Sequence, residues 1–247
     1  MKKLLTIILL ALGATITNAQ TSSTVPVTGD VTVGFESKFF LEGVNAPGSN
    51  FIAAAANVDV DGILIGVKTW TTYDSQTVML AKPTLTQSGL KYTIGKVGYV
   101  FTSDFAKLTL GADFVHTAAV ISLPGAQNDT LPFVRLDGKL TNYVIWNVRT
   151  LFDSKNRNNS YEGNLSTPIP VAGALKVVPT VGLGCNNPGS ATIPQFYADK
   201  KYAQAGLGLV YGTKEVTASL LGGVHRTDIT STKGQVTYYT VSLSHKF

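Results

Sequence analysis

Between Asp30 and Phe247, apolar and polar residues alternate with a period of two in about a dozen separate segments. The segment Lys107–Phe114 is an example, because its leucines and its phenylalanine fall on one row and its polar residues fall on the other. A period of two is typical of β-strands whose two faces meet different environments. The chain is therefore predicted to be all-β, with one apolar and one polar face on each strand.

Twelve strands are predicted, and ten or fourteen remain open. They are expected near 30–42, 50–60, 63–72, 89–101, 106–117, 129–136, 139–152, 160–169, 174–184, 200–211, 214–226 and 235–247. Pro132, Pro168 and Pro179 weaken three of these assignments, since proline cannot donate a ladder hydrogen bond. No helix longer than two turns is expected after residue 29.

The connections between these strands alternate in length. Short links are expected at Asp61-Gly62, 102–105, Asp137-Gly138, 171–173 and 212–214, and longer ones at 44–49, 73–88, 118–129, 153–159, 185–199 and 227–234. Short periplasmic turns and long extracellular loops are typical of a transmembrane antiparallel up-and-down β-barrel. A soluble β-sandwich with Greek-key connections has no reason to sort its loops in this way.

The first 29 residues resemble export elements rather than barrel strands. Lys2 and Lys3 precede an apolar stretch over 4–16, and small residues lead to an expected cleavage between Ala19 and Gln20. We therefore expect a signal peptide at 1–19, a short periplasmic segment at 20–29 and an outer-membrane barrel at 30–247. No later apolar run approaches the length of a spanning helix, which excludes a helical inner-membrane protein.

The last predicted strand ends on an aromatic residue. Tyr239, Val241 and Leu243 share one row with Phe247, the final residue of the chain. A terminal aromatic on the lipid-facing row resembles the C-terminal signature of bacterial outer-membrane proteins. Phe247 is therefore the predicted signal for the barrel assembly machinery of a Gram-negative bacterium.

The segment 31–43, Val-Thr-Val-Gly-Phe-Glu-Ser-Lys-Phe-Phe-Leu-Glu-Gly, resembles the opening strand of the TorF-type porin family. That family begins with Val-Thr-x-Gly-Tyr-x-Ser-x-Tyr-x-Phe-Arg-Gly just after the signal peptide. The resemblance implies an outer-membrane pore of poorly defined substrate, without catalytic residues. The sequence departs from the pattern at Glu42, where the family usually carries arginine, so no role of that arginine is carried over.

Few residues in the chain suggest catalysis or metal binding. His116, His225 and His245 share no ligand spacing, and neither Gly-x-Ser-x-Gly nor His-Glu-x-x-His is present. Cys185 is the only cysteine, which excludes an intramolecular disulfide. We expect no catalytic residue, no metal, no cofactor and no enzymatic activity. The scattered net charge of +5 does not favour nucleic acid.

Placing the apolar rows toward lipid leaves a set of charged residues pointing into the lumen. The predicted pore-lining residues are Glu36, Lys38, Lys68, Lys96, Lys107, Asp113, Arg135, Arg149 and Lys176. Seven cations against two acids favour anions. We therefore predict passive diffusion of small polar solutes or ions, with a modest anion preference. A barrel plugged by these side chains, which acts as a structural or surface-interaction protein, and a secreted soluble β-sandwich that binds a ligand remain as alternatives.

Overall fold

A computed structural model describes most of the predicted barrel. The described residues are 26–38, 40–41, 44–45, 50–72, 76–79, 84–87, 91–118, 128–141, 143–153, 158–188, 200–226 and 235–247. The predicted signal peptide at 1–19 and residues 20–25 of the predicted periplasmic segment lie outside them. No helix in the described part of the chain is long and apolar enough to cross a membrane.

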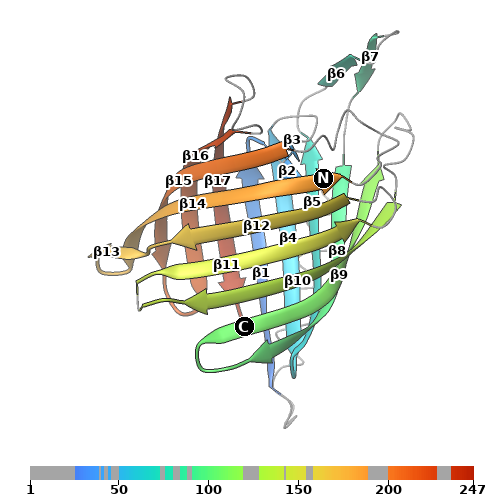
Figure 1. Cartoon of the computed structure of the whole chain (residues 1–247). Coiled ribbons are helices and arrows are strands. Elements are labelled where there is room, and N and C mark those ends of the chain that lie inside the picture. The colour runs from blue at the N-terminus through green and yellow to red at the C-terminus, as the bar shows by residue number, and fades with distance from the viewer. Residues whose placement is uncertain are drawn as a thin grey trace.

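Twelve strands form one closed antiparallel barrel (Figure 1). They are β1 (Val27–Glu36), β4 (Phe51–Val60), β5 (Ile63–Thr72), β8 (Lys91–Thr102), β9 (Ala106–Ala118), β10 (Asn128–Lys139), β11 (Ile145–Asp153), β12 (Asn158–Ser166), β14 (Leu175–Pro188), β15 (Lys200–Gly212), β16 (Val216–Arg226) and β17 (Gln235–Lys246). Each strand pairs with its neighbour along the chain, and β17 pairs with β1 to close the ring. The prediction of a twelve-stranded up-and-down barrel is confirmed, and the β-sandwich alternative is wrong.

Five further strands are short. β2 (Phe40–Leu41) pairs with β3 (Val44–Asn45), and β6 (Gln76–Met79) pairs with β7 (Thr84–Gln87). β13 (Ile169–Ala172) continues the line of β12 alongside the start of β14, and a turn at Gly173 follows it. The predicted link at 171–173 therefore lies slightly later in the chain.

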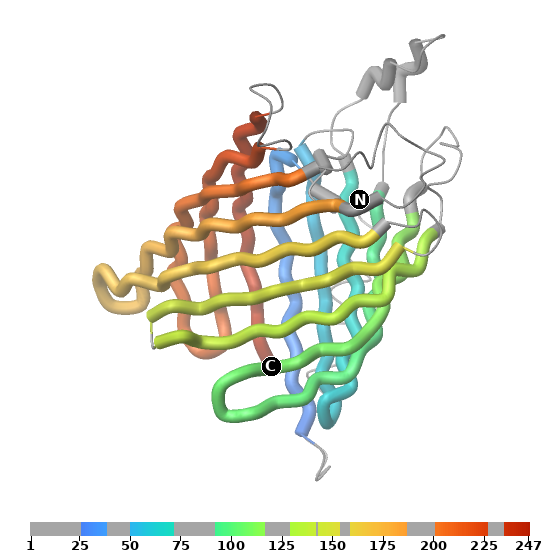
Figure 2. Tube along the Cα trace, viewed as in Figure 1, coloured from blue at the N-terminus to red at the C-terminus, as the bar shows by residue number. Residues whose placement is uncertain are grey.

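The two ends of the barrel differ in their connections. Short turns join β4 to β5, β8 to β9 and β15 to β16 at the end where β1 begins and β17 finishes. Figure 2 follows the chain through these turns toward the lower left. Most links at the opposite end are longer, as the sequence predicts, but the β11–β12 link at 154–157 is shorter than the β10–β11 link at 140–144.

The turn at Asp61-Gly62 shows why β4 and β5 match their predicted bounds so closely. Asp61 has φ 53° and Gly62 has φ 84°, the left-handed conformations that a tight hairpin turn needs. The Gly62 N–H donates to Asp59 Oδ1 at 2.8 Å. This local turn chemistry favours the observed register of the hairpin.

The predicted turn at Asp137-Gly138 is wrong, because both residues lie inside β10 and pair with Asn147 and Trp146 of β11. The Arg135 guanidinium holds the Asp137 carboxylate, and a Cβ at Gly138 would lie 2.5 Å from the Trp146 ring. Both residues therefore belong to strand β10 and not to a turn. The actual turn follows Leu140, whose N–H donates to Val144 O at 3.0 Å.

The first strand also differs from its expected range of 30–42. β1 begins at Val27 and ends at Glu36, and Phe40 and Leu41 belong to β2 instead. Ser37 ends the strand because its N–H donates to Tyr239 O and its Oγ accepts from the Tyr239 N–H. Lys38 consequently lies beyond the strand.

Apolar side chains alternate outward along the strands. Exposed members of this outer row include Ile52, Ile65, Val97, Leu110, Val134, Val148, Val181, Leu207, Leu220 and Val241. Their direct neighbours in sequence face the interior of the barrel. An exposed apolar band around a closed barrel is the surface that a bilayer solvates.

Candidate functional site

The candidate site is the lumen, and the register places most of the predicted charged residues there. Eight of the nine lie on the inner rows of their strands: Glu36, Lys68, Lys96, Lys107, Asp113, Arg135, Arg149 and Lys176. Lys107 and Lys176 are exposed near the short-turn end. Lys38 is not on an inner row, since it follows the end of β1. That these side chains line a pore stays a prediction.

A cavity of about 350 Å³ lies inside the barrel. It is lined by Lys68, Lys96, Asp113 and Arg149 among the predicted residues. Asn57 on β4 and Glu162 on β12 also line it, although these strands lie six positions apart in the ring of twelve. The cavity therefore extends across the width of the barrel.

Glu36 on β1 is held by two residues of β5. Lys68 Nζ lies 2.8 Å from Glu36 Oε1, and Trp70 Nε1 donates to Glu36 Oε2 at 2.7 Å. Opposite Trp70 and Lys68, the intervening strand β4 presents only Ala53 and Ala55 on its inner row. Because these alanines are small, the side chains of β5 reach β1 along the wall.

A second group connects β9 with β11. Arg149 forms an ion pair with Asp113, which is 4% exposed. The Phe133 ring of the intervening strand β10 lies beneath this pair, with its centroid 4.9 Å from the Arg149 guanidinium carbon. The Lys96 Nζ lies 5.7 Å from the same centroid. Two cations thus share one ring and one nearby carboxylate.

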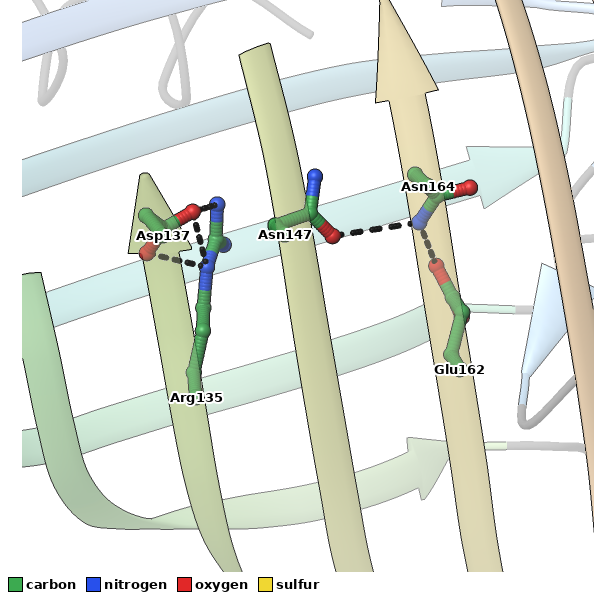
Figure 3. A network of polar contacts seen from close by, with 5 residues as sticks. All are labelled: Arg135, Asp137, Asn147, Glu162 and Asn164. Carbon is green, nitrogen blue, oxygen red and sulfur yellow. Dashed lines mark hydrogen bonds and ion pairs between the residues drawn. The ribbon is translucent and has the colours of Figure 1, made fainter. Parts of the chain in front are cut away.

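Figure 3 shows the polar contacts on the next strands. Arg135 pairs with Asp137 of its own strand at 2.6 Å. Asn164 Nδ2 donates to Asn147 Oδ1 at 3.2 Å and to Glu162 Oε1 at 2.6 Å. These contacts join groups on the same strand or on adjacent strands.

Glu162 and Asn164 also receive hydrogen bonds from β15, across β14. Tyr202 Oη donates to Glu162 Oε2 at 3.2 Å, and Gln204 Nε2 donates to Asn164 Oδ1 at 2.7 Å. Gly184 lies between the first pair and Gly182 between the second. A methyl group on Gly184 would overlap the Tyr202 ring, so the missing side chain makes room for the contact.

Gly184→Ala should therefore displace Tyr202 and lower the free energy of unfolding by about 1–3 kcal/mol, the usual cost of overpacking. Gly222→Ala is the matched control, because its Cβ would meet nothing within 4 Å. Denaturant titration of the refolded variants compares the two. Equal stability of Gly184→Ala and Gly222→Ala would show that Gly184 is not needed for the contact.

The inner rows carry more acids than the sequence analysis assigned to them. Asp30, Asp137, Asp153 and Glu162 lie on the inner row in addition to Glu36 and Asp113. The inner rows therefore carry at least six acids rather than the two that were expected there. Asp137 was expected in a turn and was therefore not counted. Glu162 lies in β12, where most residues are polar, so the alternation of apolar and polar residues is hidden there.

The inner wall is also less polar on one side than the alternation predicts. Phe51, Trp70 and Tyr92 form one buried cluster, and Val115, Leu131, Phe133 and Leu151 form a second. The opposite side is lined largely by small neutral residues, which include Thr32, Gly34, Gly206, Gly208, Ser219 and Ser242. We call these small residues the neutral wall.

The three histidines lie on different strands. His116 is on the outer row of β9 and His245 on the outer row of β17, whereas His225 is buried on the inner row of β16 beside Tyr202. Within the described ranges, no group of three or more His, Cys, Asp or Glu residues could hold a metal ion. Cys185 carries a free thiol.

The chain resembles solved porin barrels in fold. Its structure matches one described as "KdgM porin" with a TM-score of 0.53 and 12% identity, over 89% of this chain and 99% of that one. It matches a "NanC porin" structure with a TM-score of 0.51 and 13% identity, over 89% of this chain and 100% of the other. No protein-family model matches the sequence, and no curated protein matches it. The likeness shows that the chain has the fold of outer-membrane porin barrels.

Proposed function

We propose that this protein is an outer-membrane channel through which small polar solutes and ions diffuse passively. The observation that carries the proposal is the direction of the ion pairs and hydrogen bonds inside the barrel. Lys68–Glu36, Arg149–Asp113 and Tyr202–Glu162 each join strands two positions apart in the ring. Side chains that plugged the lumen would instead pair across its diameter. Pairing along the wall supports an open path through the cavity.

The proposed channel prefers anions modestly. Lys68, Lys96 and Arg149 line the cavity with two carboxylates, Asp113 and Glu162. Arg149 and Lys68 have carboxylate partners, so Lys96 contributes most to the field that a permeating ion meets. A single cation without a carboxylate partner, in a narrow lumen, favours the passage of anions without excluding cations.

Salt-gradient reversal potentials in planar bilayers test this proposal. The wild-type barrel should show an anion preference at about 0.01 M salt, where charges interact over about 30 Å, and should lose it as the salt concentration rises. Lys96→Gln should weaken the preference. Lys107→Gln, at the exposed short-turn end, is the matched control and should change it less. A cation preference of the wild type would contradict the assigned lumen charges.

We also propose that the chain is a TorF-type porin located in the outer membrane of a Gram-negative bacterium. The segment 31–43 supports this membership, and its Gly34 fits a position where a Cβ would lie 2.6 Å from Val241 O. The apolar outer rows support the location, since they would be unfavourably exposed to water in a secreted protein. On this proposal, the partners are outer-membrane lipid and the barrel assembly machinery.

A further inference from the structure

The hairpin formed by β13 and the start of β14 differs in composition from the other turns at its end of the barrel. Residues 163–175 carry no charged side chain. In contrast, the turns that follow β4, β8 and β15 carry Asp61, Asp104 and Lys214, respectively. Figure 1 shows the hairpin projecting at the left, past the ends of β10 and β11. An uncharged, projecting hairpin is less suited to water than these charged turns.

The register connects the outward face of β13 to the apolar band of the barrel. Ile169 pairs with Val177, and Val177 pairs with Leu209. The same row continues through Leu220 and Val241, which belong to the outer row already described. Direct cross-strand partners share one face of a sheet, and Ile169 is 47% exposed, as are Leu220 and Val241. The lipid-facing surface therefore extends without interruption onto the hairpin.

The second edge of β13 is unsuited to pairing with another strand. Among the described residues, β13 pairs only with β14, and the Thr167 N–H donates to Pro179 O of that strand. Successive residues of a strand direct their backbone groups to opposite sides, so residues 168 and 170 face away from β14. Both are prolines, which have no N–H to donate. This edge offers only carbonyl groups, which disfavours a partner that adds a strand.

We propose that the β13–β14 hairpin docks on the lipid of the leaflet at the short-turn end of the barrel. Ile169 enters the apolar part of this leaflet as a continuation of the lipid-facing band. The carbonyl groups of Pro168 and Pro170 stay among the hydrated headgroups, because unpaired backbone groups are not tolerated in the hydrocarbon region. The inference goes beyond the proposed channel function and rests only on the proposed location of the barrel in a membrane.

Site-directed spin labelling tests this docking in barrels refolded in phosphatidylcholine vesicles. Cys185→Ser removes the native thiol, and a nitroxide is attached at Ile169→Cys. Its collision rate with oxygen, which concentrates in the bilayer, is compared with its collision rate with a water-soluble nickel chelate. Leu209→Cys is the lipid-facing reference, and Lys214→Cys is the water-exposed reference at the β15–β16 turn.

The ratio of oxygen to nickel collision rates at Ile169→Cys should lie closer to the ratio at Leu209→Cys than to the ratio at Lys214→Cys. Val171→Cys lies nearer the tip of the hairpin, at a position that is 58% exposed. Because the hairpin lies at the surface of the leaflet, this label should give a ratio between those of Ile169→Cys and Lys214→Cys. Val171→Cys also keeps the test decisive if Ile169→Cys does not refold.

Two results at Ile169→Cys would overturn the inference. A ratio equal to that at Lys214→Cys would place the hairpin in water. Low collision rates with both reagents would show that protein covers the hairpin, and dipolar broadening between labels would identify that protein as a second copy of this chain.

The Leu209→Cys reference separates this inference from the proposed location. A water-exposed Leu209→Cys would contradict the placement of the outer rows in a membrane and, with it, the docking of the hairpin. A lipid-facing Leu209→Cys together with a water-exposed Ile169→Cys would contradict the docking alone and leave the proposed location standing.

Discussion

Arginine at Leu220 should lower the free energy of unfolding of the refolded barrel by about 2–4 kcal/mol, because it places a charge in the middle of the lipid-facing band. Leu220 lies near the centre of β16, on the outer row, with 47% of its side chain exposed. The neighbouring Ser219 belongs to the neutral wall, so an arginine there would face the lumen and not the lipid. Ser219→Arg should therefore cost much less, although the two positions are adjacent in the chain.

Denaturant titration of Leu220→Arg and Ser219→Arg in the same lipid measures this difference directly. Because a shift of register by one residue exchanges the two faces of a strand, the order of the two costs reports the register. A larger cost for Ser219→Arg, or equal costs, would contradict the assignment of the inner and outer rows.

Deletion of Phe247 should remove most of the assembled barrel. The Phe247 N–H donates to Gly29 O at 3.1 Å, and the Gly29 N–H donates to Phe247 O at 2.9 Å. The Phe247 ring also covers Gly29, where a Cβ would lie 2.5 Å from the ring. These contacts close the seam between β17 and β1, and the two hydrogen bonds together contribute about 1–3 kcal/mol.

The assembled fraction is measured by gel mobility with and without boiling, on outer-membrane fractions washed with carbonate. Phe247→Ala separates the two contributions, because it keeps the backbone hydrogen bonds and loses only the aromatic ring. If the ring is the predicted assembly signal, Phe247→Ala should fail to assemble as severely as the deletion. Full assembly of the deleted chain would contradict the role of Phe247 in both closure and recognition.

The alternation in the sequence is sufficient to predict the barrel because each strand separates lipid from the lumen. β5 matches its predicted range of 63–72, since the Asp61-Gly62 turn fixes where the strand begins. The same dipeptide at Asp137-Gly138 was misleading. There, Asp137 pairs with Arg135 of the same strand, and Gly138 lies against Trp146 of β11, so both residues remain within β10.

The contents of the lumen were harder to predict than its wall. The row of a charged residue can be predicted where the alternation is clear, but several of these charges have partners two strands away. Tyr202 reaches Glu162 because Gly184 has no side chain, and Lys68 reaches Glu36 past Ala55. Each of these contacts depends on side chains of three neighbouring strands. The alternation of apolar and polar residues within one strand does not predict such contacts.

The most direct test of the channel is the conductance of single refolded barrels before and after a bulky thiol reagent modifies the neutral wall. Cys185→Ser removes the only native thiol, and Ser219→Cys then places a new one in the lumen. We expect stepwise conductance that falls after modification of Ser219→Cys and is unchanged after modification of Leu220→Cys, which faces lipid. The absence of conductance steps at any voltage, or an equal fall for both variants, would contradict an open path along this wall.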